Sequence, residues 1–437
     1  GSGNVTLRIA GAAGTVVENF GVGSSVTISN NEVSITPTSG LTVGDTYYIS
    51  YPSGAFTNTG GDVSYVGTAY TFGIRGPLGQ LFAAGNGSQG QLAQNNRTEY
   101  SSPVQVGSDT TWEMISGGAN WAFGVKTDNT LWAWGNNTDG GLGLNNANPV
   151  RYSSPVQIPG TTWVAVSSGG YSTIATRTDG TLWAWGSASY RGQLGLNNRA
   201  AYSSPVQVPG TTWGKTRDTL SSGSSKWHSI KTDGTLWSVG AGAYGQNGNN
   251  SNVDRSSPVQ IPGTTWSIVT ANHTGSAAIK TDGTLWAWGY NAGGSLGQNQ
   301  PETTDRSSPV QIPGTTWSKV VKAGPYSYGG VKTDGTLWMW GKNNEGQLGQ
   351  NDVANRSSPV QVGSDTTWRN GAASGAYSSL FTKTDGTMWG WGKNEKGQLG
   401  HSNIIKYSSP VQIPGTSWKL STISTLQVGQ NAYMLKI

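Results

Sequence analysis

Six aspartates recur in one sequence context and are the titratable groups that first suggest chemistry. Each follows Lys-Thr or Arg-Thr and precedes Gly or Asn: Asp128, Asp179, Asp233, Asp282, Asp334 and Asp385. Paired carboxylates can hydrolyse a glycosidic bond, but Asp before Gly in a tight hairpin accepts hydrogen bonds from its own backbone. No pair departs from the repeated pattern. We therefore predict turn residues, no catalytic residues and no enzyme; a carbohydrate-active enzyme with an acid and base from distant repeats is one alternative.

Metal and nucleophile chemistry has little support. The histidines His228, His273 and His401 lie in different repeats without the spacing of metal ligands. The absence of cysteine excludes disulfides, thiolate metal sites and a cysteine nucleophile. The recurrent GQLG, as at 346–349, lacks the Lys-Ser/Thr of a phosphate-binding loop and is expected to be a turn. The sequence predicts no metal and no cofactor.

One cation per repeat precedes the phrase SSP, and a tyrosine accompanies four of them. The cations are Arg97, Arg151, Arg199, Arg255, Arg306, Arg356 and Lys406, and the tyrosines are Tyr100, Tyr152, Tyr202 and Tyr407. Arginine with aromatic rings suits glycans and protein interfaces. Packing of each cation over the turn of its own repeat is the alternative interpretation. These residues form a candidate ligand-binding rim.

A second candidate set consists of aromatic residues in the segments that vary most between repeats. Its members are Trp121, Tyr171, Trp227, Tyr326 and Tyr377. Segments that join strands carry function more often than the strands themselves. Neutral drift of exposed loops explains the variation equally well, so both interpretations stay open.

The elements that must position these residues come from a repeat. The motif TLW and its variants begin at Leu81, Leu131, Leu182, Leu236, Leu285, Leu337 and Met388. In one unit, strands are expected at 315–324, 328–334 and 336–341, and a fourth at 308–314 closes the preceding unit; we call them first, second, third and fourth strands. Four short strands at a period near 50 predict a β-propeller blade. We therefore predict an all-β chain with a seven-bladed propeller over residues 76–437.

The ends of the propeller predict how the ring closes. The first repeat supplies only a third and a fourth strand, at 79–85 and 102–106, whereas the last residues supply a first and a second strand, at 416–424 and 431–437. We expect one mixed blade from these four strands. The segment 70–76 also reads as a second strand, but we assign it to the preceding domain.

The connections predict a binding face. In a propeller blade, the first–second and third–fourth connections lie on one face, and these vary between units. The second–third and fourth–first connections hardly vary. A surface that recognises an asymmetric partner must differ from blade to blade, so the variable face is the candidate.

Residues 76–437 resemble the regulator of chromosome condensation repeat family. The last unit matches the family pattern at Asp385-Gly386, Trp391-Gly392, Asn394, 397–400 and Pro410. The resemblance implies a seven-bladed propeller but no single activity, because members include a nucleotide-exchange factor, a β-lactamase inhibitor and many bacterial and phage proteins. The nearly uniform units are most similar to bacterial surface and bacteriophage structural proteins.

Residues 1–75 lack the repeat and alternate like strands with one buried face. We predict a small β-sandwich that resembles bacterial Ig-like domains at 46–49, 54–57 and 71–72. One or two strands that usually open such domains are missing, so we expect an N-terminal truncation of this domain; a neighbouring subunit that fills the open edge is the alternative.

Composition narrows the partners. The net charge of +5 over 437 residues is too small to indicate a nucleic-acid binder, and no apolar run approaches the length of a membrane span. We predict a recognition or structural module of a phage virion appendage or a bacterial surface protein, located on the virion or outside the cell. Its partner would be a host receptor, a glycan or a neighbouring subunit; a soluble protein inhibitor or regulator is the other alternative.

The tryptophans of GTLWAWG (283–289) resemble a binding platform but have a structural explanation. In a strand, Trp286 and Trp288 point to one side while Leu285 and Ala287 point to the other. Both faces of a propeller blade are covered by neighbouring blades. We therefore predict that these tryptophans pack between blades.

Overall fold

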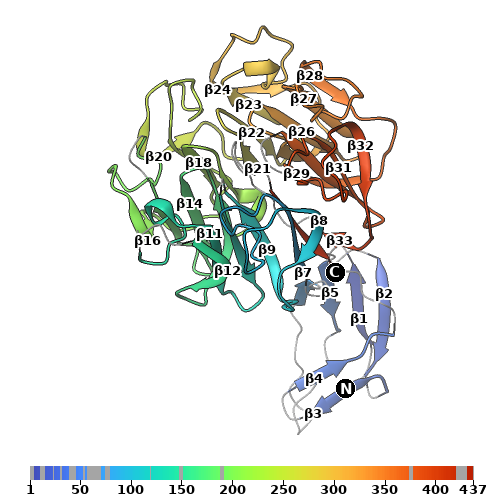
Figure 1. Cartoon of the computed structure of the whole chain (residues 1–437). Helices are drawn as coiled ribbons and strands as arrows, with labels where there is room; N and C mark the ends of the chain where they lie inside the picture. Colours follow the sequence, from blue (N-terminus) through green and yellow to red (C-terminus); the bar gives the residue numbers. More distant parts are fainter. Residues whose placement is uncertain are drawn as a thin grey trace. The chain divides into compact units, whose positions relative to one another are not determined.

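The computed structural model describes residues 4–9, 15–22, 24–29, 32–38, 46–52, 55–56, 70–73, 79–118, 120–146, 151–187, 191–373, 377–419 and 431–436. The contacts between residues divide the chain into two compact units, residues 1–78 and 79–437. Every regular element except three short 3-10 helices is a strand in the described part (Figure 1). The predicted all-β class is therefore confirmed.

The first unit contains two small antiparallel sheets. Its four-stranded sheet has the order β2-β1-β5-β6, and its two-stranded sheet pairs β3 with β4. The strands are β1 (Asn4–Ile9), β2 (Val16–Gly21), β3 (Val26–Ser29), β4 (Glu32–Ile35), β5 (Thr46–Ser50) and β6 (Tyr70–Gly73). Val5, Leu7 and Phe20 are buried together on one side of this arrangement. Residues 70–73 pair with β5 in this unit.

The second unit consists of seven four-stranded sheets, which we number blades 1 to 7. Blade 1 contains β9 (Trp112–Gly117), β10 (Trp121–Lys126), β11 (Leu131–Asn136) and β12 (Arg151–Ile158). Blade 2 contains β13 (Trp163–Ser168), β14 (Ser172–Arg177), β15 (Leu182–Gly186) and β16 (Tyr202–Val208). Blade 3 contains β17 (Leu220–Ser222), β18 (Lys226–Ile230), β19 (Leu236–Gly240) and β20 (Arg255–Ile261). In each of these sheets the strands pair antiparallel in chain order.

Blades 4 to 6 repeat this arrangement. Blade 4 contains β21 (Trp266–Ala271), β22 (Gly275–Lys280), β23 (Leu285–Gly289) and β24 (Arg306–Ile312). Blade 5 contains β25 (Trp317–Lys322), β26 (Ser327–Lys332), β27 (Leu337–Gly341) and β28 (Arg356–Gln361). Blade 6 contains β29 (Trp368–Ala373), β30 (Ser378–Lys383), β31 (Met388–Gly392) and β32 (Tyr407–Ile413). The first strands of neighbouring blades contact one another, so they line the propeller axis. Three 3-10 helices, η1 (Thr138–Gly140), η2 (Arg217–Thr219) and η3 (Ala292–Gly294), interrupt the connections.

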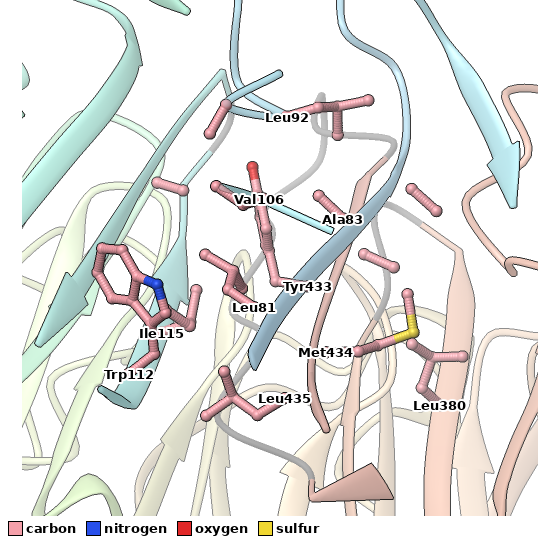
Figure 2. Packing of buried hydrophobic residues seen from close by; sticks show 14 of the residues in the cluster. Leu81, Ala83, Leu92, Val106, Trp112, Ile115, Leu380, Tyr433, Met434 and Leu435 are labelled. Atoms are coloured by element: carbon pink, nitrogen blue, oxygen red, sulfur yellow. The ribbon is translucent and has the colours of Figure 1, made fainter. Parts of the chain in front are cut away.

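Blade 7 combines strands from both ends of the second unit. Its order is β33 (Trp418–Lys419), β34 (Asn431–Lys436), β7 (Gln80–Gly85) and β8 (Tyr100–Gln105). The Tyr433 hydroxyl of β34 donates to the Gln91 carbonyl at 2.6 Å. Figure 2 shows the buried cluster that this blade forms with blades 1 and 6, including Leu81, Met434, Leu435, Trp112, Ile115 and Leu380. Blade 7 thus packs on both neighbours and closes the ring.

The tryptophans of the third strands join the blades. In blade 4, Trp286 and Trp288 pack toward blade 3, whereas Leu285 and Ala287 pack toward blade 5. The Trp288 indole is fully buried and donates to the Gln246 carbonyl of blade 3 at 2.9 Å. The sides and the inter-blade position agree with the sequence prediction.

The recurrent aspartates organise the hairpin turns. Asp282 Oδ1 accepts hydrogen bonds from the backbone N–H of Thr284 at 3.0 Å and from its hydroxyl at 2.7 Å. Trp286 Nε1 donates to the same threonine hydroxyl at 2.9 Å, and Lys280 Nζ lies 4.4 Å from the Trp286 ring centre. Gly283 takes a positive φ of 76° at the turn. All six aspartates accept these bonds from the threonine two residues later, so the turn interpretation is confirmed.

Candidate functional site

The candidate site lies on the face that carries the first–second and third–fourth connections, which we call the loop face. Antiparallel pairing in chain order places these connections at the same ends of the strands. The opposite ends carry the uniform Asp-Gly turns. All sixteen residues that the sequence nominates belong to the loop-face connections or to the strand ends beside them.

The cations of the rim are held to different degrees. Arg97, Arg151, Arg199 and Lys406 are exposed, while Arg255, Arg306 and Arg356 are partly buried. Several reach other loops: Arg151 Nε donates to Gln89 of blade 7, and Lys406 Nζ lies 3.6 Å from Glu345 of blade 5. Arg356 forms an ion pair with Asp352 of its own connection at 2.5 Å. Of these three contacts, the Arg356 ion pair lies within its own repeat, as the packing interpretation predicts, whereas the other two join neighbouring blades.

The rim tyrosines hold their own connections. Tyr100, Tyr152, Tyr202 and Tyr407 are each partly buried. Each hydroxyl accepts a hydrogen bond from an asparagine of the same connection, at distances between 2.9 and 3.2 Å: Asn96, Asn146, Asn198 and Asn403. A ring fixed in this way supports the connection to which it belongs. The rim tyrosines therefore stabilise the connections that carry them.

For two tryptophans, the structure contradicts the prediction of a ligand-binding role. Trp121 is only 6% exposed, and its Nε1 donates to Ser168 Oγ of blade 2 at 2.7 Å. Trp227 is fully buried, lies opposite Val239 and packs 6.0 Å from the Trp213 ring. Neither ring can meet a ligand on the surface. Both were nominated because they adjoin variable connections, but each belongs to a second strand that packs between blades.

Four tyrosines from four successive blades gather on the loop face. Tyr244 and Tyr290 come from the third–fourth connections of blades 3 and 4, and Tyr326 and Tyr377 come from the first–second connections of blades 5 and 6. The ring centres of Tyr244 and Tyr290 are 4.7 Å apart, and those of Tyr290 and Tyr326 are 6.4 Å apart. Burial raises the pKa of the Tyr326 hydroxyl, and Tyr377, Tyr290 and Tyr244 raise it further. We call these four residues the tyrosine arc.

The arc has an exposed end and a polar border. Tyr244 is 45% exposed, whereas the other three rings are partly buried. His273 lies 5.9 Å from the Tyr326 ring, and Lys342 Nζ lies 5.5 Å from it. Burial, aided by the charge of Lys226, lowers the pKa of His273 to about 4, so this imidazole is neutral at pH 7.

The sequence nominated only half of the arc. Tyr326 and Tyr377 were among the candidates, but Tyr244 and Tyr290 were missed. A signal existed for one of them, because Tyr290 follows Trp-Gly where the other units carry Asn, Lys, Ser or Ala. Tyr171 of blade 2, another aromatic residue that the sequence analysis proposed, is 46% exposed.

A small pocket with a mixed polar and apolar lining lies on the axis between the first strands. Its lining includes Ser167 of β13, Ser221 of β17, Thr270 of β21 and Lys322 of β25. Segment η2 crosses the axis here, since Arg217 donates to the Gly371 carbonyl of blade 6 at 3.1 Å. Asp218 pairs with Lys319 of blade 5 at 2.7 Å.

The described residues also bear on two other classes of site. Among these residues, no three His, Asp or Glu side chains are grouped so that they could hold a metal ion. None of the helices in the described ranges has the length and apolar character of a membrane span.

Comparison with known families identifies the repeat. The model of the regulator of chromosome condensation (RCC1) repeat matches residues 128–176, 179–217, 282–325, 334–381 and 385–431, which together are more than half of the chain. A second model of the same repeat matches residues 163–193. The matched segments begin at or near the Asp-Gly turns in most cases.

Several characterised proteins are similar to this chain. Human E3 ubiquitin-protein ligase HERC2 is 27% identical over 350 residues, which are 77% of this chain but 7% of that protein. The ultraviolet-B receptor UVR8 of Arabidopsis thaliana is 28% identical over 310 residues, 69% of this chain and 69% of the receptor. The chain thus spans a small part of HERC2.

Solved structures share the fold. Prp20p from Saccharomyces cerevisiae superposes with a TM-score of 0.72 at 17% identity, covering 83% of this chain and 92% of that one. Human WBSCR16 superposes with a TM-score of 0.69 at 18% identity, covering 82% and 98%. At such identities the likeness concerns the fold alone.

Proposed function

The chain belongs to the RCC1 repeat family, and from this premise we propose that its propeller is a non-enzymatic recognition module that binds a partner through the loop face. Propellers of this family are typically protein-binding modules. The yeast relative Prp20p is known for its binding properties to Gsp1p and histones, which shows that this fold can present a binding surface. Fold alone does not choose the partner, so the site must carry the proposal.

The tyrosine arc is the observation that carries the proposal. Tyrosine offers a large amphipathic ring at low entropic cost, and it is enriched where proteins bind partners. The arc joins residues from four blades, so a single partner could contact connections that differ in sequence. Among the described residues, none of its hydroxyls accepts the hydrogen bond from a neighbouring asparagine that fixes each rim tyrosine.

The biological setting of the proposal comes from the pattern of the chain. Nearly uniform units behind an N-terminal unit with Ig-like alternation are typical of phage appendages and bacterial surface proteins. We therefore propose a location on a virion or outside the cell. The partner would be a host receptor or surface glycan, or a neighbouring subunit of the same assembly.

Binding to intact bacterial cells and to a glycan array tests the proposal. The double variant Tyr244→Ala/Tyr290→Ala removes the closest ring pair of the arc and should weaken binding about 10-fold or more, as expected for hot-spot residues. The matched control is the rim variant Arg151→Ala/Tyr152→Ala/Arg199→Ala/Tyr202→Ala. Loss of binding in the control, with unchanged binding in the arc variant, would contradict binding through the arc and indicate that the partner binds the rim.

A soluble inhibitor or regulator is the second candidate. It would use the same face, and it is favoured by relatives that bind proteins, such as yeast RCC1 (Prp20) with bound Kap60. This candidate predicts one tight soluble protein partner and no binding to cells or extracted glycans. The same arc variant would then weaken the protein complex.

A further inference from the structure

Two lysines are buried at the end of the propeller axis that carries the loop face. Lys226 begins β18 and is 1% exposed, and Lys322 ends β25 and is 6% exposed. Lys226 Nζ donates to the Asn272 carbonyl at 3.4 Å, and Lys322 Nζ donates to the Ser222 carbonyl at 3.3 Å. Both acceptors lie at the loop-face ends of first strands. Two ammonium groups from blades 3 and 5 therefore converge on one place.

The Lys226 ammonium group has a carbonyl oxygen as its neighbour and no carboxylate partner among the described residues. None of the ion pairs between described residues includes Lys226. Burial, aided by the charge of Lys322, lowers the pKa of Lys226 to about 7. A buried cation that meets only carbonyl oxygen is costly unless an anion accompanies it. The arrangement is the one that an anionic ligand would stabilise.

Other hydrogen-bond donors surround the lysines. Asn272 is 1% exposed, and its Nδ2 has no acceptor, although its Oδ1 accepts from Gly275 N at 2.7 Å. The buried Tyr328 hydroxyl lies beside Gly275 and near the Asn272 backbone. Buried polar groups without partners are rare in folded proteins. An anion that accepts hydrogen bonds from Lys226 and Asn272 would pair with the Lys226 charge and give the Asn272 amide the acceptor that it lacks.

The lysines also adjoin the tyrosine arc. His273, whose ring lies 5.9 Å from Tyr326, is close enough to Lys226 for that charge to lower its pKa. The backbone N–H of His273 donates to the Pro325 carbonyl at 3.3 Å, which ties the connection of blade 4 to that of blade 5. The lysines and the arc therefore adjoin the same pair of connections.

We propose that Lys226 and Lys322 form an anion site that binds one carboxylate or phosphate group of the ligand whose remaining part contacts the tyrosine arc. The proposal deepens the recognition function and rests on it. The shared chemistry is a compact group with two or more oxygen acceptors. Each ammonium donates to it, as lysines do in phosphate sites.

Nuclear magnetic resonance of lysine-labelled protein tests the site with two probes, inorganic phosphate and N-acetylneuraminic acid. Either probe should shift the Lys226 and Lys322 side-chain signals in a saturable way and raise the pKa of Lys226 by at least one unit. Lys226→Met and Lys322→Met should each weaken binding of that probe at least 10-fold. Lys319→Met, three residues before Lys322 on β25 and paired with Asp218, is the matched control and should change the affinity less than twofold.

The outcomes separate this inference from the proposed function. Saturable binding of phosphate alone identifies a phosphate ligand, whereas stronger binding of the acidic sugar that Tyr290→Ala weakens identifies an acidic glycan. No saturable shift with either probe, or equal affinity in Lys226→Met, Lys322→Met and the wild type, would overturn the anion site. Binding of cells through the arc would stand in that case, since Tyr244→Ala/Tyr290→Ala tests it independently. Lys226→Gln repeats the measurement with a polar side chain of similar length.

Discussion

Trp227 and Val239 face each other in the antiparallel pair β18–β19, and together they fill the space that a second tryptophan fills in other third strands. In blade 4 that tryptophan is Trp288, which closely approaches Gly248 of the preceding blade. For blade 3, the corresponding glycine of the preceding blade is Gly195, and Trp227 and Val239 approach it instead. In blade 3 the second strand therefore supplies the large ring that the third strand supplies in blade 4, and the contact with the preceding blade is the same.

We expect Trp227→Ala to destabilise the propeller by about 3–5 kcal/mol, because it leaves a large cavity between blades 2 and 3. The measurement is the urea midpoint together with the melting temperature. The double variant Trp227→Val/Val239→Trp should recover part of the loss, since it restores the arrangement of the other blades. Tyr171→Ala, at a ring that is 46% exposed, is the control with an expected change below about 0.5 kcal/mol. Equal effects of Trp227→Ala and the control would contradict this account.

The blade architecture could be predicted from sequence because each local signal occurs many times. Asp-Gly turns, alternating tryptophans and a period near 50 point to the same strands in every unit, so an ambiguous element such as 79–85 is identified by comparison with the others. The alternation at Leu285 and Trp286 predicts which side each residue takes, and the structure confirms it.

The candidate site could be predicted only in part, because the missing information is three-dimensional. Alternation does not tell whether an aromatic residue at the edge of a connection points outward, and Trp121 and Trp227 point between blades instead. The meeting of Tyr244 with Tyr290 depends on the curvature of the ring, which brings together residues 46 positions apart. The burial of Lys226 likewise depends on strands from several blades.

The Asp-Thr-Trp contacts should contribute to stability. Thr284→Val removes the hydroxyl that donates to Asp282 and accepts from Trp286 Nε1, and we expect a loss of about 1 kcal/mol for this partly buried pair of bonds. Thr284→Ser keeps the hydroxyl and should retain most of the stability. Denaturant titration of both variants measures the difference. Equal stability of the serine and valine variants would exclude a role for the hydroxyl.

Acid should destabilise the propeller through carboxylates whose folded-state pKa is depressed. Partial burial alone would raise the pKa of Asp365, but hydrogen bonds from Lys383 and Thr367 outweigh it and lower the pKa to about 2. A depressed carboxyl pKa contributes stability above the unfolded value near 3.9, and this contribution is lost as the pH falls toward 2. Melting temperatures between pH 2 and 7 should fall below about pH 4. Asp365→Asn should lower the plateau and flatten this part of the curve; an unchanged acid slope would contradict the prediction.

Mild alkali should have the opposite effect through the buried lysines. Burial lowers the pKa of both Lys226 and Lys322 to about 7, whereas an unfolded lysine titrates near 10.4. Between these values the unfolded chain binds more protons, so the free energy of unfolding should rise as the pH increases from 7 to about 9.5. Lys226→Met should flatten this rise, while Lys319→Met should leave it intact because that residue is paired with Asp218. Chemical denaturation at several pH values measures the slope. A flat wild-type curve would mean that the buried ammonium groups keep their ordinary pKa, and saturating phosphate should reduce the slope if an anion holds the lysines protonated.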